Sequence, residues 1–108
     1  MRPAIPLFAL CLLVAVTGRV PAQESGDPRQ GRAVAQAVCA ACHAVEKGRP
    51  SPNAVAPTFE AIANLRGISA RALIVALQTS HKTMPNLVLG DGETRNVIVY
   101  ILSLRAAD

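Results

Sequence analysis

The sequence contains no tryptophan, and only one tyrosine and two phenylalanines are aromatic among its 108 residues. Beyond residue 22, the aromatic side chains are Phe59 and Tyr100 alone. A short domain of this composition, rich in alanine and valine, struggles to form a sufficient core by itself. Domains of this size often gain the missing stability from a disulfide, a metal or a cofactor. We therefore expect a large buried cofactor to complete the core.

The chain also lacks any run of basic residues and any alternation of basic with aromatic residues. It has 11 Lys and Arg against 7 Asp and Glu. Arg2 and Arg19 lie in the first 22 residues, which leaves 9 basic against 7 acidic residues in the rest of the chain. This balance argues against nucleic acid as a partner and gives no strong steering signal toward any one protein partner.

No apolar run reaches the roughly 20 residues that a membrane-spanning helix needs. The longest, from Ala4 to Val16, follows Arg2 and precedes the small residues of Val20-Pro21-Ala22. This order is typical of a secretory signal. We expect residues 1–22 to be a cleaved signal peptide and residues 23–108 to form one domain in the periplasm, without stable membrane insertion. A retained membrane anchor is the alternative.

Residue periodicity beyond the signal predicts an all-α domain. Asp27-Pro28 is a typical helix start, and the predicted helices cover residues 29–41, 58–66, 70–79 and 93–104. The run VIVYIL at residues 97–102 favours a strand by local propensity. A strand there has no convincing partner strand, and the preceding GDGE is a plausible helix cap with an acidic first turn. The segments 45–57 and 81–91 are predicted loops.

Only two cysteines follow the signal, and they lie together in VCAACHAVEKG at residues 38–48. Cys39, Cys42 and the adjacent His43 admit three chemistries: a disulfide, a metal site or covalent attachment of haem. A structural zinc usually has four Cys or His ligands, and here only His81 is left as a fourth. A disulfide would close a very small loop, stabilise little and leave His43 unexplained.

Haem attachment uses all three residues. In CxxCH the two thiols form thioethers with haem, and the histidine can bind the iron. At helical spacing the three side chains lie on one face and address one haem edge. A redox disulfide of the thioredoxin type is less favoured, because no strand leads into this CxxC.

GRAVAQAVCAACHAVEKG, APTFEAIANLRG, TMPNLVL and ETRNVIVYILSL together resemble class I bacterial monohaem c-type cytochromes, which have His/Met iron ligation. The resemblance spans essentially residues 23–108. It implies about four helices around one covalently bound haem c, with the N- and C-terminal helices crossing. Gly31 and Tyr100 resemble members of that crossing.

The resemblance also implies the roles of individual residues. Cys39 and Cys42 would hold the haem, His43 would be the proximal axial ligand of the iron, and Met84 the distal ligand. The carbonyl of Pro57 would accept a hydrogen bond from His43 and orient it. The alternative for Met84 is to fill a gap in the core, the usual role of a lone methionine, although this role is less expected in a loop between Thr83 and Pro85. His81, three residues before Met84, is the competing distal ligand.

These expectations favour a periplasmic one-electron carrier over an enzyme, with redox proteins as its partners and as a monomer or small complex. One alternative is a cytochrome subunit or dedicated electron acceptor of a periplasmic dehydrogenase or oxidase complex. A less favoured alternative is a haem-based ligand sensor or peroxidase, which requires an open or displaceable sixth ligand.

Overall fold

The computed structural model describes residues 25–107 together with Met1 and Pro3. The predicted signal peptide therefore falls outside the described residues, apart from those two positions. The described chain is helical and contains no β-strand. Its elements are α1 (Pro28–Val34), the π-helix η1 (Ala35–Cys39), α2 (Phe59–Ala63), α3 (Ala70–Gln78) and α4 (Asp91–Ser103). The all-α prediction is confirmed, and none of the helices described is long and apolar enough to cross a membrane.

Polar side chains cap the first three α-helices and fix where they begin. Each accepts a hydrogen bond from a backbone N–H of the first turn: Asp27 Oδ1 from Arg29 at 2.8 Å, Thr58 Oγ1 from Ala61 at 3.0 Å and Ser69 Oγ from Ala72 at 3.1 Å. After α2, Gly67 adopts a φ of +76°, a left-handed conformation that favours glycine. The predicted helix starts are confirmed, and α2 is shorter than predicted.

The run VIVYIL is helical because its apolar side chains meet the core at helical spacing. Val97, Ile98, Tyr100 and Ile101 are all buried, and Leu104 continues the same face. The helix is also fixed at its start, where the Glu93 carboxylate accepts a hydrogen bond from the Gly90 backbone N–H at 2.9 Å. Burial of one helical face thus outweighs the strand preference of the β-branched residues.

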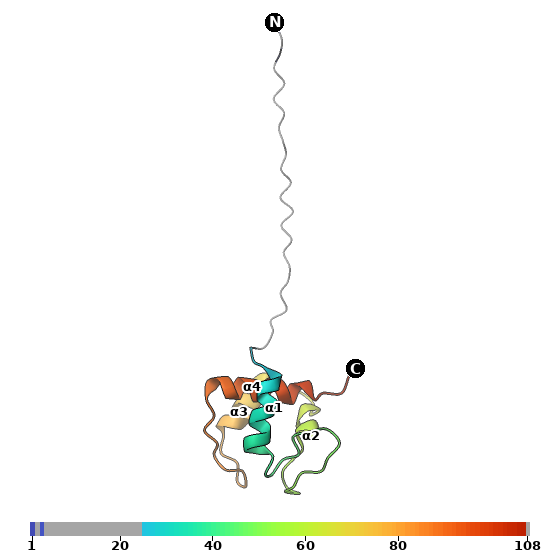
Figure 1. The fold of residues 1–108 in the computed structure, drawn as a ribbon, viewed down its shortest axis with the longest axis vertical. Helices are drawn as coiled ribbons and strands as arrows, with labels where there is room; N and C mark the ends of the chain where they lie inside the picture. Colours follow the sequence, from blue (N-terminus) through green and yellow to red (C-terminus); the bar gives the residue numbers. More distant parts are fainter. Residues whose placement is uncertain (2, 4–24, 108) are drawn as a thin grey trace.

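α1 and α4 cross at very close range, as the sequence predicts (Figure 1). A Cβ atom added at Gly31 would lie 1.8 Å from the Asn96 carbonyl oxygen and 2.9 Å from Tyr100 Cβ. The Asn96 side chain also accepts a hydrogen bond from the Asp27 backbone N–H at 2.8 Å. Only glycine allows this approach, so Gly31 sets the distance between the two helices.

The second half of the predicted first helix is not α-helical. From Ala35 to Cys39 the chain forms a π-helix, and the Ala40 N–H bonds to the Ala35 carbonyl at 3.0 Å. The segment is helical as predicted, but its type differs, and the helix ends at Cys39 rather than at about residue 41. The wider turn buries Ala35 and Cys39 together, at 0% and 7% exposure.

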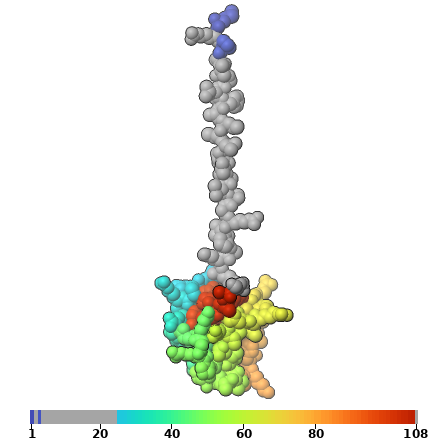
Figure 2. Space-filling view, turned by 90° about the vertical axis from the view of Figure 1, so that its right-hand side faces the viewer, coloured from blue at the N-terminus to red at the C-terminus, as the bar shows by residue number. Residues whose placement is uncertain are grey.

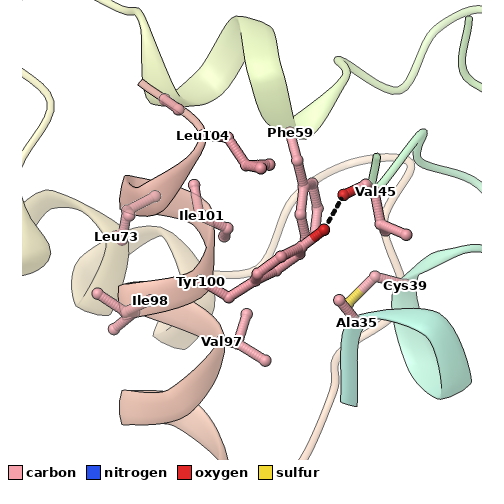
Figure 3. Close-up of a cluster of buried hydrophobic side chains, with 11 residues drawn as sticks. Ala35, Cys39, Val45, Phe59, Leu73, Val97, Ile98, Tyr100, Ile101 and Leu104 are labelled. Carbon is pink, nitrogen blue, oxygen red and sulfur yellow. Dashed lines mark hydrogen bonds between the residues drawn. The ribbon is translucent and has the colours of Figure 1, made fainter. Parts of the chain in front are cut away.

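Figure 3 shows the core between α4, α2 and the end of the first helix. Val97 is the largest side chain that is fully buried. The cluster comprises Ala35, Cys39, Val45, Phe59, Ala63, Leu73, Val97, Ile98, Tyr100, Ile101 and Leu104. This core is small for the chain it supports, in line with the shortage of large apolar residues in the sequence.

Candidate functional site

Cys39, Cys42 and His43 belong to one turn that follows directly from η1, here called the motif turn (residues 39–43). The Cys39 carbonyl accepts hydrogen bonds from the Cys42 N–H at 3.2 Å and from the His43 N–H at 2.9 Å. Both cysteines carry free thiols. The three side chains predicted to act together are thus held in a single turn of backbone.

The two thiols have different surroundings. Cys39 faces the core beside Ala35 (Figure 3), and burial raises the pKa of its thiol. Cys42 is partly exposed. Because the thiolate is the reactive form of cysteine, burial makes the Cys39 thiol less reactive in this environment.

The imidazole of His43 is oriented by Pro57 and Phe59. Its Nδ1 lies 2.6 Å from the Pro57 carbonyl oxygen. A carbonyl oxygen only accepts, so Nδ1 donates and the hydrogen of the neutral ring is on that nitrogen. The Nε2 lone pair is then free to bind a metal ion. The Phe59 ring packs on the imidazole, with centroids 5.5 Å apart and planes at 49°.

Three further hydrogen bonds order the segment 44–58, here called the His43 loop, and one of them joins it to the motif turn. The Asn53 N–H donates to the Cys42 carbonyl at 3.1 Å, and the Ala44 N–H donates to Ser51 Oγ at 3.0 Å. The Phe59 N–H closes the loop by donating to the Ala44 carbonyl at 2.9 Å. Sequence reasoning missed Ser51, which lies between two prolines in a segment without a motif.

α4 and the first helix hold the start of the His43 loop. The Tyr100 hydroxyl donates to the Val45 carbonyl at 2.6 Å, two residues after His43 (Figure 3). Burial, reinforced by the Glu46 carboxylate, raises the pKa of Tyr100. Glu46 in turn accepts hydrogen bonds from Arg32 at 2.7 Å and Gln36 at 3.1 Å, and the bond from Arg32 lowers the pKa of Glu46.

Met84 lies in the segment 80–90 between α3 and α4, here called the Met84 loop. It contributes to a hollow of about 620 Å³. The apolar lining of the hollow comes from α3 and this loop: Ile74, Leu77, Met84, Pro85, Leu87 and Leu89. No residue of the motif turn lines this hollow. In Figure 1, the His43 loop and the Met84 loop lie on either side of the motif end of the first helix.

His81, the competing ligand, lines the same hollow, but its ring is bound elsewhere. Its Nε2 lies 2.8 Å from the Ala76 carbonyl oxygen in the last turn of α3. The sequence identified His81 as a possible ligand but gave no signal for this contact, which depends on how the chain turns after α3.

The donor set fits a covalently attached haem. Two free thiols and an imidazole with a free Nε2 share one turn, which is the arrangement that CxxCH haem attachment requires. Apolar side chains and a thioether line the hollow beneath α3.

In the space-filling view, the green segments near residues 45–60 cover the lower part of the face shown, and α4 (red) lies at its upper end (Figure 2).

Comparison with known proteins identifies the family of the chain. The family model described as cytochrome c oxidase, cbb3-type, subunit III matches residues 26–101, which include every candidate ligand named above. No curated protein and no solved structure matches the chain significantly.

Proposed function

We propose that this chain, which belongs to the family described as cytochrome c oxidase, cbb3-type, subunit III, is a periplasmic electron carrier whose iron is bound by His43 and Met84. The family match makes the chain a monohaem c-type cytochrome with covalently bound haem c. A haem-based electron carrier is therefore its general function. The location, the two axial ligands and the free-diffusing role are the proposal.

The contact between His43 and Pro57 is the observation that carries the proximal half of the assignment. The 2.6 Å hydrogen bond fixes the ring and directs Nε2 away from Pro57. A hydrogen bond of this kind orients a histidine ligand and strengthens its hold on a metal. Cys39 and Cys42 lie in the same turn, so their thiols are the residues that would form the two thioethers.

The distal assignment is supported by the surroundings of Met84 and His81. Met84 is the only methionine beyond residue 22 and lines a hollow to which α3 and the Met84 loop contribute apolar side chains. His81 lines that hollow too, but its Nε2 donates to the Ala76 carbonyl, which leaves only the more hindered Nδ1 lone pair for a metal. A thioether beside an imidazole whose Nε2 is engaged favours Met84 as the ligand.

Haem iron supplies a one-electron couple between ferrous and ferric states. With His43 and Met84 as its two protein ligands, the iron would have no open position for oxygen or peroxide, which favours electron transfer over an oxidase or peroxidase activity. A neutral thioether and burial both disfavour the extra positive charge of the ferric state and so raise the reduction potential.

The test is an absorption spectrum of the oxidised and reduced protein, matured in a periplasm with the haem-attachment machinery. We expect a haem c spectrum with the weak far-red band of sulfur-to-iron charge transfer, and loss of that band in Met84→Ala. Its persistence in Met84→Ala would contradict the assignment. Carbon monoxide binding to the reduced wild type at neutral pH would instead favour the ligand sensor.

The location is tested by cell fractionation and by the N-terminal sequence of the purified protein. We expect the protein in the periplasmic fraction, with an N-terminus close to Gln23. A protein that begins at Met1 and sediments with membranes would identify the first segment as a retained anchor.

The description of the family favours a second candidate function, a cytochrome subunit of a periplasmic oxidase or dehydrogenase complex. The two candidates share the haem site and differ in assembly. Gel filtration of the native extract distinguishes them: a free carrier elutes as a small monomer, whereas a subunit co-elutes with a much larger complex.

A further inference from the structure

The side chain of His81 connects the Met84 loop to the end of α3. Its Nε2 lies 2.8 Å from the Ala76 carbonyl oxygen. Because a carbonyl only accepts, Nε2 is the donor. Ala76 is in the last turn of α3 (Ala70–Gln78), where carbonyls have no intrahelical partner. The other contact of this carbonyl is long, 3.4 Å from the Thr79 N–H. His81 therefore supplies the shorter hydrogen bond at this carbonyl.

The backbone couples His81 to Met84. The Met84 N–H donates to the His81 carbonyl at 3.3 Å, and the two residues form an isolated antiparallel bridge. Residues 81–84 thus form one turn, with His81 at its start and Met84 at its end. A contact that fixes the His81 ring against α3 also restricts where the Met84 side chain begins.

Elsewhere the Met84 loop is held only at its far end. Among the described residues, the hydrogen bonds of this loop beyond Met84 are at Gly90, whose N–H bonds to Glu93 and whose carbonyl accepts from Thr94. Val88, in the middle of this stretch, is 98% exposed. Of the contacts that join the Met84 loop to another element, the one made by the His81 side chain is therefore nearest to Met84 in the sequence.

We propose that His81 is a positioning residue for Met84, and that its hydrogen bond to Ala76 preorganises the distal ligand. The inference rests on the proposed function, in which Met84 binds the iron. A loop that is already ordered loses less conformational entropy when its side chain becomes a ligand. Loss of the anchor therefore weakens the hold of Met84 on the iron relative to a competing external ligand.

The experiment is a titration of the ferric, haem-loaded protein with imidazole, which competes with Met84 for the distal position. We expect His81→Ala to bind imidazole about 2- to 10-fold more tightly than wild type, the range that the loss of one ordinary hydrogen bond produces. His81→Gln keeps a side-chain N–H that can reach the carbonyl, and we expect it to restore most of the wild-type affinity.

Thr79→Val is the matched control. It removes a side-chain hydrogen bond of 2.6 Å, from Thr79 Oγ1 to the Val75 carbonyl, at the same helix end. That bond stays within the α3 terminus and does not reach the Met84 loop. We expect Thr79→Val to bind imidazole as wild type does, even where it lowers the unfolding midpoint as much as His81→Ala. Amide hydrogen exchange at Met84 should be faster in His81→Ala alone.

The outcomes separate this inference from the proposed function. One outcome is that wild type shows the sulfur-to-iron band and binds imidazole with the same affinity as His81→Ala. This result would overturn the positioning role and leave Met84 as the ligand. A wild type without the band, whose distal position opens to imidazole only in His81→Ala, would make His81 the ligand and overturn both. If Thr79→Val binds imidazole as tightly as His81→Ala does, His81 acts only as a general helix cap, and its positioning role is overturned.

Discussion

Replacement of Gly31 by alanine tests the helix crossing on which the whole site is built. The added Cβ would lie 1.8 Å from the Asn96 carbonyl oxygen, whereas ordinary contacts begin at 3.4 Å. That oxygen belongs to the backbone in the middle of α4 and cannot rotate away as a side chain can. The two helices must therefore separate by about 1.6 Å, the difference between these two distances, and Tyr100 moves with α4.

The expected change in the free energy of unfolding of Gly31→Ala combines two opposing effects, helix preference and overpacking. Alanine is favoured over glycine inside a helix by about 1 kcal/mol. Overpacking costs about 1–3 kcal/mol, and a backbone obstacle places Gly31 at the upper end of that range. We expect Gly31→Ala to lower the free energy of unfolding by about 2 kcal/mol, which corresponds to a fall in Tm of about 8–16 °C for a domain of this size. The measurement is thermal unfolding of the haem-loaded protein, followed by far-ultraviolet circular dichroism.

Gly92→Ala is the control for this prediction. Gly92 is also helical, in the first turn of α4, but an added Cβ there meets nothing within 4 Å. The helix preference then acts alone, and we expect a change between zero and a gain of about 1 kcal/mol. If Gly31→Ala is as stable as wild type, or gains as Gly92→Ala does, the crossing is not set by Gly31 and the reasoning is refuted.

Further predictions concern the contacts around the motif turn and the haem. Tyr100→Phe leaves the Val45 carbonyl without its donor, so we expect a loss of about 1–3 kcal/mol in urea unfolding. Because burial raises the pKa of Tyr100, its contribution is fully present below about pH 10 and is lost as pH rises through the folded-state pKa. Unfolding from pH 8 to 11 should show this loss in wild type only. Glu46→Gln should lower Tm slightly at pH 7; since the hydrogen bond from Arg32 lowers the pKa of Glu46, the difference should disappear as pH falls below about 4 and at high salt. Protein produced without haem attachment should show less helical circular dichroism and a broad, weakly cooperative transition, because its core is small; a sharp transition like that of the haem-loaded protein would contradict this.

Features that depend on a few neighbouring residues could be predicted from the sequence. Asp27-Pro28 and Ser69 start helices because a side-chain oxygen reaches an N–H two or three residues ahead. The CxxCH motif is local in the same way, since three residues of one turn are brought together by helical backbone alone. The close approach of the two helices at Gly31 was also predicted, from the resemblance of this glycine to a member of a known helix crossing, and it is confirmed.

Features that depend on contacts between distant segments could not be predicted. The contact from Tyr100 to Val45 joins positions 55 residues apart, and nothing near either residue indicates it. No local sequence signal indicates the π-helix at Ala35–Cys39, in which Ala35 and Cys39 are both buried in the core. The Ala76 contact of His81 likewise follows from the path of the chain after α3. Iron ligation by Met84 and the signal peptide stay predictions.

The crossing of α1 and α4 has a consequence for how this domain tolerates insertions and deletions. The α1–α4 crossing is closed by backbone contact between residues near positions 31 and 96, and the His43 loop and the Met84 loop both lie in the chain between them. Doubling the length of a flexible loop costs only about 0.6 kcal/mol in closure entropy. The α1–α4 crossing can therefore keep its geometry while the loops that carry Pro57 and Met84 change in length. Changes confined to these two loops can therefore alter the surroundings of the haem without rebuilding the helix crossing.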